Sequence, residues 1–106
     1  MIYRVIITPE AEADLRTTYR YIRSQAPRPA RDWIRRARRG AKSLARYPER
    51  CPLAPESASF REPIRELLFG AGNRGTYRFL FVILDQSVYT LHVRHGSMLP
   101  VSPKGE

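Results

Sequence analysis

The sequence predicts an α+β fold in which a two-helix hairpin packs on one face of a mostly antiparallel sheet, with the order β-α-α-β-β-β. A short β-branched run opens the chain, and two amphipathic helical segments follow it. Three apolar, strand-like runs occupy the second half, separated by a glycine-rich turn and a short polar turn. The 106 residues suit one domain. We expect this domain over residues 1–98 and a loose C-terminal tail over residues 99–106.

The first strand is predicted over residues 2–7, where Ile, Val and Tyr dominate. A helix begins directly after it, because Thr8 can accept an N–H bond as N-cap and Pro9 suits the first helical position. The helix is expected to end near Ala26, since a residue that precedes proline resists the α conformation.

The second helix is predicted from about residue 29 to about residue 46, and the short link implies an antiparallel hairpin. Gly40 inside it costs about 1 kcal/mol relative to alanine, so a close helix–helix contact is expected there. Residues 28–46 hold seven Arg and one Lys against one Asp, a net charge of +7. This one segment carries most of the total net charge of +9.

The second half of the chain predicts a proline-rich loop over residues 48–63, which crosses the edge of the sheet, and three strands. The strands are expected over residues 64–69, 77–84 and 88–95. Strand alternation separates a set facing the helices from a set on an open face. The set predicted to face the helices is Phe79, Phe81, Ile83, Tyr89, Leu91, Val93 and His95, and the open face receives Arg78, His92 and Arg94.

Bulk properties narrow the function classes. A pI near 10.6 indicates a phosphate-rich or acidic partner. No apolar run approaches the roughly 20 residues that span a bilayer, and no signal-peptide pattern opens the chain. The single cysteine, Cys51, forms no internal disulfide, so a reduced, cytoplasmic setting is expected. One Cys and two His without ligand spacing predict no metal site, and nothing indicates a cofactor.

The chain contains several short motifs in a fixed order: V-I-I-T-P-E-A-E-A-D-L with Y-R-Y-I, then W-I and L-A-R-Y-P, then R-E-L, Y-R-F-L-F-V-I and L-H-V-R-H-G. In this order, the motifs resemble the RelE/ParE family of bacterial toxin–antitoxin toxins. The resemblance covers residues 2–98 and implies a toxin neutralised by a cognate antitoxin. The opening P-E-A-E-A-D-L and the closing R-H-G favour the ParE side, whose members inhibit DNA gyrase. The alternative is a RelE-type, ribosome-dependent messenger RNA endoribonuclease, and a third reading is an inactive toxin kept as a basic interaction module.

A metal-independent ribonuclease needs an acid–base group and cations on the phosphate. His95 occupies the position of the histidine in the histidine-using nucleases, and Arg78 would hold phosphate oxygens. The expected substrate contacts are Arg65, Arg74, Tyr77, His92 and Arg94. Three of these residues also have a structural interpretation. Arg78 could form an ion pair with Glu62 or Glu66, His95 could hydrogen-bond to the backbone, and Tyr77 could belong to the hydrophobic core. The lysine cluster typical of RelE-like nucleases is absent, which favours the gyrase inhibitor.

The basic side of the second helix is a candidate partner-binding face. Its members are Arg31, Arg35, Arg38, Arg39, Lys42 and Arg46. Like charges at this density repel one another unless an anionic partner covers them. An acidic antitoxin segment and nucleic acid are the two candidate partners, and the remaining alternative is a solvated surface.

Overall fold

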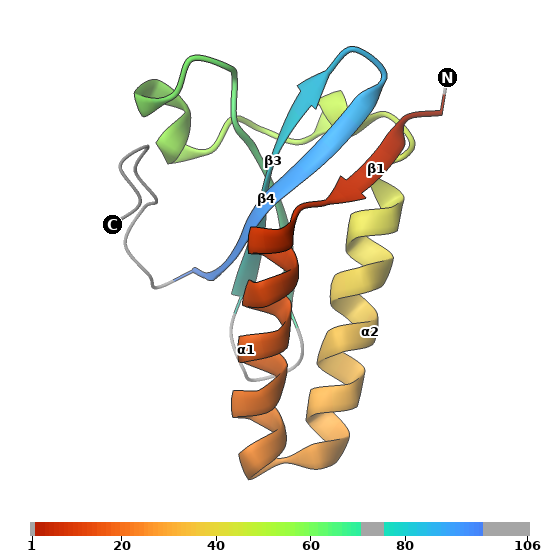
Figure 1. Ribbon diagram of the computed structural model, residues 1–106, viewed down its shortest axis with the longest axis vertical. Coiled ribbons are helices and arrows are strands. Elements are labelled where there is room, and N and C mark those ends of the chain that lie inside the picture. Colours follow the sequence, from red (N-terminus) through yellow and green to blue (C-terminus); the bar gives the residue numbers. More distant parts are fainter. Residues whose placement is uncertain (1, 71–75, 97–106) are drawn as a thin grey trace.

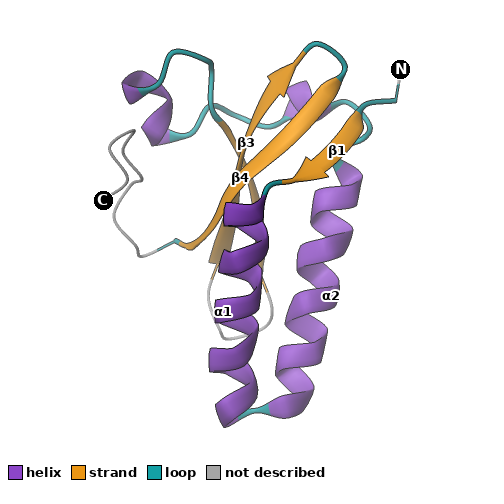
Figure 2. Ribbon diagram, in the orientation of Figure 1, coloured by secondary structure: helices purple, strands orange, loops and turns teal. Residues whose placement is uncertain are grey.

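The computed structural model describes residues 2–70 and 76–96. Its elements are β1 (Arg4–Ile7), α1 (Pro9–Gln25), α2 (Pro27–Ser43), β2 (Arg65–Gly70), β3 (Thr76–Leu84) and β4 (Ser87–His95). Two short 3₁₀ turns, Pro48–Arg50 and Pro55–Ser59, lie between α2 and β2. The two helices run side by side along one face of the sheet (Figure 1, Figure 2). The predicted fold class and element order are confirmed.

The strand order in the sheet is β1-β4-β3-β2. The pairs β2–β3 and β3–β4 are antiparallel, whereas β1 runs parallel to β4. A parallel pair needs a long crossover between its strands. Here everything between β1 and β4, including the helix hairpin, forms that crossover, which leaves β1 and β2 at the two edges.

The start of α1 is capped as predicted. The Thr8 Oγ1 accepts the N–H of Ala11 at 3.2 Å and donates to the carbonyl of Thr90 at 2.7 Å. The link between the helices is a single extended residue, Ala26, with φ −154° and ψ 91°. The second helix therefore begins two residues earlier than predicted. It also ends earlier, at Ser43, because the chain then turns to place Arg46 in a bridge with Ile2.

The main core lies between the helix hairpin and the sheet. Trp33 of α2 is fully buried there against Tyr77 and Phe69, with ring centroids 5.2 and 5.9 Å away. Phe79 joins the same cluster, as predicted for the helix-facing set. Gly40 faces this core, and a Cβ there would lie 3.4 Å from Leu67 and 3.8 Å from Phe79. The expected helix–helix contact is therefore wrong, because the close approach is between helix and sheet.

Gly40→Ala is expected to raise the free energy of unfolding by up to about 1 kcal/mol, because alanine gains helix propensity and its methyl group makes ordinary van der Waals contacts. Urea denaturation at neutral pH measures the change. Gly40→Leu is the matched control, since its longer side chain would collide with Leu67 and Phe79 and should destabilise the fold. A destabilised alanine variant would contradict this account.

The second face of the sheet is not open, which corrects the prediction. The loop between α2 and β2 passes the β2 edge of the sheet, where Leu53 forms a bridge with Arg65. The same loop then continues over the second face. Ala54 and Ile64 are buried there against Leu80 and Val82. The loop can cover this face because β3 presents apolar side chains on both faces of the sheet.

A β-bulge changes which face the β4 side chains occupy. Leu80 is opposite His92, but the next residue, Phe81, is opposite Thr90, so Leu91 is an extra residue. Tyr89 and Leu91 consequently pack on the second face with Leu80, and their predicted helix-facing orientation is wrong. Beyond the bulge, Val93 lies in the helix-facing core as predicted.

Candidate functional site

Arg78 lies in a buried ion-pair cluster on the second face. Its Nη2 and Nη1 donate to the two carboxylate oxygens of Glu56 at 2.7 and 3.0 Å, and Nη1 also donates to Glu66 at 3.0 Å. The side chain of Glu56 is fully buried, and that of Arg78 is 9% exposed. The hydrogen bonds to Glu56 raise the pKa of Arg78 above its already high value, so the guanidinium stays charged. The Pro55–Ser59 turn supplies Glu56, and the cluster therefore ties this turn to β3.

His95 lies on the opposite face of the sheet from Arg78. In the β3–β4 register His95 is paired with Tyr77, the residue directly before Arg78, and successive strand residues face opposite sides. The imidazole contacts the Tyr77 ring edge-on, with centroids 4.9 Å apart. The structure therefore does not bring together the two residues predicted to be catalytic.

The predicted substrate contacts are also dispersed. Arg65 donates from Nη1 to the carbonyl of Cys51 at 2.6 Å, which binds the loop backbone to β2. Tyr77 is buried in the aromatic cluster around Trp33. Arg94 is half-buried and lies opposite Arg78 in the register. Arg74, on the glycine-rich turn, lies outside the described residues.

His92 makes a polar contact that the sequence analysis missed. Its Nδ1 lies 3.2 Å from Oδ2 of Asp14, and the same oxygen accepts the Val93 N–H at 3.0 Å. This contact joins α1 to β4. Asp14 directly precedes the buried Leu15, so its place at the margin of the apolar stripe was the available signal. Glu56 gave no comparable signal, because no periodic pattern covers its loop.

A small hollow of about 250 Å³ lies beside His92 on the second face. Its walls are mainly apolar, and it is lined by Glu10, Phe60, Ile64, Leu80, Leu91 and His92. Within residues 2–70 and 76–96, no three His, Cys, Asp or Glu side chains gather as a metal site would require. In the same part of the chain, no helix has the length and apolar character to cross a membrane.

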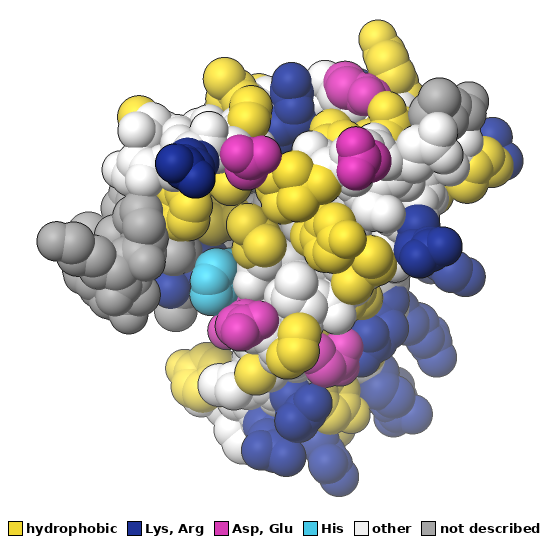
Figure 3. Space-filling view, turned by 45° about the horizontal axis from the view of Figure 1, so that its top comes forward, with side chains coloured by type: hydrophobic (Ala, Val, Ile, Leu, Met, Phe, Trp, Pro, Cys, Tyr) yellow, Lys and Arg dark blue, Asp and Glu magenta, His cyan; other side chains and the backbone are white. Residues whose placement is uncertain are grey.

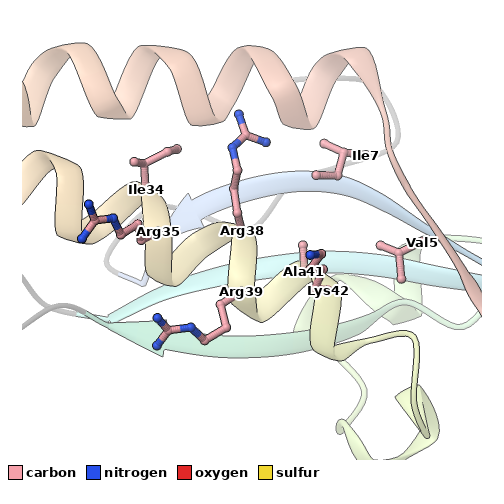
Figure 4. Close-up of a pocket in the computed structure, with 8 residues that line it drawn as sticks. All are labelled: Val5, Ile7, Ile34, Arg35, Arg38, Arg39, Ala41 and Lys42. Atoms are coloured by element: carbon pink, nitrogen blue, oxygen red, sulfur yellow. The ribbon is translucent and has the colours of Figure 1, made fainter.

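A larger groove, which we call the α2–β1 groove, has a volume of about 600 Å³ (Figure 4). Its floor is apolar and its rim is basic. It is lined by Val5, Ile7, Ile34, Arg35, Arg38, Arg39, Ala41 and Lys42. Four of the six residues predicted as the partner-binding face thus line one groove, while the exposed Arg31 and Arg46 lie outside its lining.

One rim cation of the α2–β1 groove is held in place. Arg38 extends toward α1 (Figure 4), where its Nη2 lies 2.9 Å from Oε2 of Glu12. The hydrogen bond from Arg38 holds the pKa of Glu12 below its ordinary value. Arg35, Arg39 and Lys42 make no ion pair with any residue that the structure describes, and all three are exposed. The groove is therefore suited to an anionic ligand with an apolar side.

Comparisons with known proteins identify relatives of the whole chain. The family model described as ParE toxin of type II toxin-antitoxin system, parDE, matches residues 5–100. The chromosomal ParDE system of P. aeruginosa has a chain of similar fold, with a TM-score of 0.70, 17% identity, and coverage of 89% of this chain and 96% of that chain. A chain of the RelBE2 toxin–antitoxin complex from Mycobacterium tuberculosis is 29% identical, with a TM-score of 0.52 and coverage of 92% and 95%. No curated protein matches.

Proposed function

Because the chain belongs to the ParE family of toxins of type II toxin–antitoxin systems, we propose that it stops growth by binding DNA gyrase and that a cognate antitoxin neutralises it. The proposal places the protein in the cytoplasm, where its target works. It assigns the chain no chemistry of its own and no cofactor.

The observation that carries the proposal is the state of Arg78. A nuclease would need this guanidinium at the reacting phosphate, but two carboxylates already occupy it in a buried cluster. Arg65 is likewise engaged, by a backbone carbonyl. His95 lies on the other face of the sheet. These contacts support a toxin that acts by binding rather than by cleavage.

We further propose that the antitoxin occupies the α2–β1 groove with an acidic, amphipathic segment. The apolar floor would receive its hydrophobic side chains, and the basic rim would pair with its carboxylates. The parallel edge strand β1 borders the groove, so the same segment can also pair with its free edge. The two structurally similar chains come from systems named for a toxin and an antitoxin together, which agrees with such a partner.

Induction of the toxin in cells without the antitoxin tests the proposed target. We expect growth arrest with a DNA damage response and intact transcripts, because a gyrase poison leaves messenger RNA uncut. Purified protein should inhibit supercoiling by gyrase at concentrations comparable to those that arrest growth in cells. Rapid transcript cleavage without a damage response would overturn the proposal, and unaffected growth would favour the inactive toxin.

The endoribonuclease remains the second candidate, because the RelBE2 chain is the more similar of the two in sequence. The matched variants His95→Ala and His92→Ala separate the candidates. If the protein acts on gyrase, both variants should arrest growth as the parent does, provided that circular dichroism shows them folded. Loss of toxicity in a folded His95→Ala variant would assign catalysis to this residue.

A further inference from the structure

A second basic surface lies away from the α2–β1 groove, at the connected ends of the two helices. We call it the hairpin patch, and it consists of Arg20 and Arg23 of α1 with Arg28 and Arg31 of α2. All four side chains are exposed. Figure 1 shows this end of the hairpin projecting beyond the described strands, and Figure 3 shows Lys and Arg side chains gathered over the helices. None of the four lines the groove.

All four arginines lie at the connected end of the hairpin, and two of them share one flank of it. The ion pair between Glu12 and Arg38 marks where that flank crosses from α1 to α2. An α-helix repeats its orientation about every 7 residues, or two turns, and about every 11 residues, or three turns. Arg23 follows Glu12 by 11 residues and Arg31 precedes Arg38 by 7, so these two lie on that flank, whereas Arg20 and Arg28 lie about 80° round their helices from it. Since packed helices lie about 8–10 Å apart and the four arginines all lie within six residues of the link at Ala26, they are gathered at one end of the hairpin.

The acids of the two helices contact residues outside the hairpin patch. The acids of the two helices are Glu10, Glu12, Asp14 and Asp32. Glu12 is paired with Arg38, Asp32 with Arg36 at 3.1 Å, and Asp14 contacts His92, while Glu10 lines the hollow on the second face. Among the residues that the structure describes, the four arginines make no ion pair. Their mutual repulsion destabilises the free hairpin, and an anionic partner would relieve it.

We propose that the hairpin patch binds the phosphate backbone of double-helical nucleic acid without sequence preference. The cations are all arginine, whose planar fork matches phosphate oxygens in two parallel hydrogen bonds. A duplex presents one phosphate about every 1.7 Å of its axis, so arginines gathered at one end of the hairpin can contact several at once. Among the described residues of the two helices, Tyr21 is the one large exposed aromatic side chain. One ring offers no stacking platform for successive unpaired bases, which favours a duplex over a single strand.

Fluorescence anisotropy with a labelled 24-base-pair DNA, the RNA duplex of the same sequence, and the single DNA strand tests the proposal on the full chain. We expect both duplexes to bind more tightly than the strand, with log affinity falling against log salt with a slope of about −4 for four contacts. Equal binding of the two duplexes supports backbone recognition. Tighter binding of one duplex also supports it and shows whether DNA or RNA is the preferred partner. Tighter binding of the single strand, or no binding of duplex at low salt, would overturn the proposal.

A matched pair of triple variants locates the site. Arg23, Arg28 and Arg31 are changed to Gln in one variant, and the exposed Arg4, Arg46 and Arg61 are changed to Gln in the other. Both lose three charges, so only the position differs. The patch variant should bind duplex at least tenfold more weakly, with the salt slope smaller by about 3, and the control should lose less than threefold. Equal losses in two variants that circular dichroism shows to be folded would refute the patch.

Discussion

Arg78→Ala is expected to lower the free energy of unfolding by about 3–5 kcal/mol, because it leaves buried carboxylates without their cation. Glu56 is the critical partner, since its side chain is fully buried, whereas Glu66 is 17% exposed and can be hydrated in part. Urea denaturation at neutral pH, followed by circular dichroism, measures the loss. A loss below about 1 kcal/mol would contradict a buried cluster that holds the Pro55–Ser59 turn on the sheet.

The control for Arg78→Ala removes both charges together. In the double variant Arg78→Met with Glu56→Leu, apolar groups replace the ion pair, and much of the lost stability should return. If Arg78 is structural, growth inhibition should return with stability. A double variant that is stable but harmless would instead assign Arg78 a direct role in toxicity.

Charge reversal at two rim positions of the α2–β1 groove, Arg35→Glu with Lys42→Glu, is expected to weaken antitoxin binding about 100-fold or more. The reversal replaces attraction by repulsion at two of the exposed cations beside the apolar floor. Titration calorimetry with the purified antitoxin measures the affinity. The salt dependence of binding should also fall, since fewer favourable charge pairs remain to be screened.

The control for the groove is Arg31→Glu with Arg46→Glu, which makes the same charge change at two exposed residues outside the groove lining. We expect this variant to lose less than fivefold in affinity. Equal losses in both variants would mean that the antitoxin senses only the total charge. Unchanged binding in the groove variant would return the rim to the status of a solvated surface.

Local signals in the chain were sufficient for the order and type of the elements. Thr8-Pro9 marks the start of α1, and the residue before Pro27 marks its end, because capping and proline geometry act within a few residues. The apolar run in β3 shows a strand buried on both faces. The basic side of α2 and the family relationship were likewise visible in the sequence, and four of the six predicted face residues line one groove.

The candidate site depended on contacts between distant segments. Glu56 pairs with Arg78 because the Pro55–Ser59 turn crosses the sheet at that place. The two residues are 22 positions apart in sequence, and no local pattern encodes the path of the turn. The bulge at Leu91 was equally invisible, and it moved Tyr89 and Leu91 to the second face. Strand alternation is a rule of period 2, so one extra residue reverses the faces on one side of it. The sequence thus determined the fold and its charge, whereas tertiary packing decided which charged groups face solvent and which are neutralised inside.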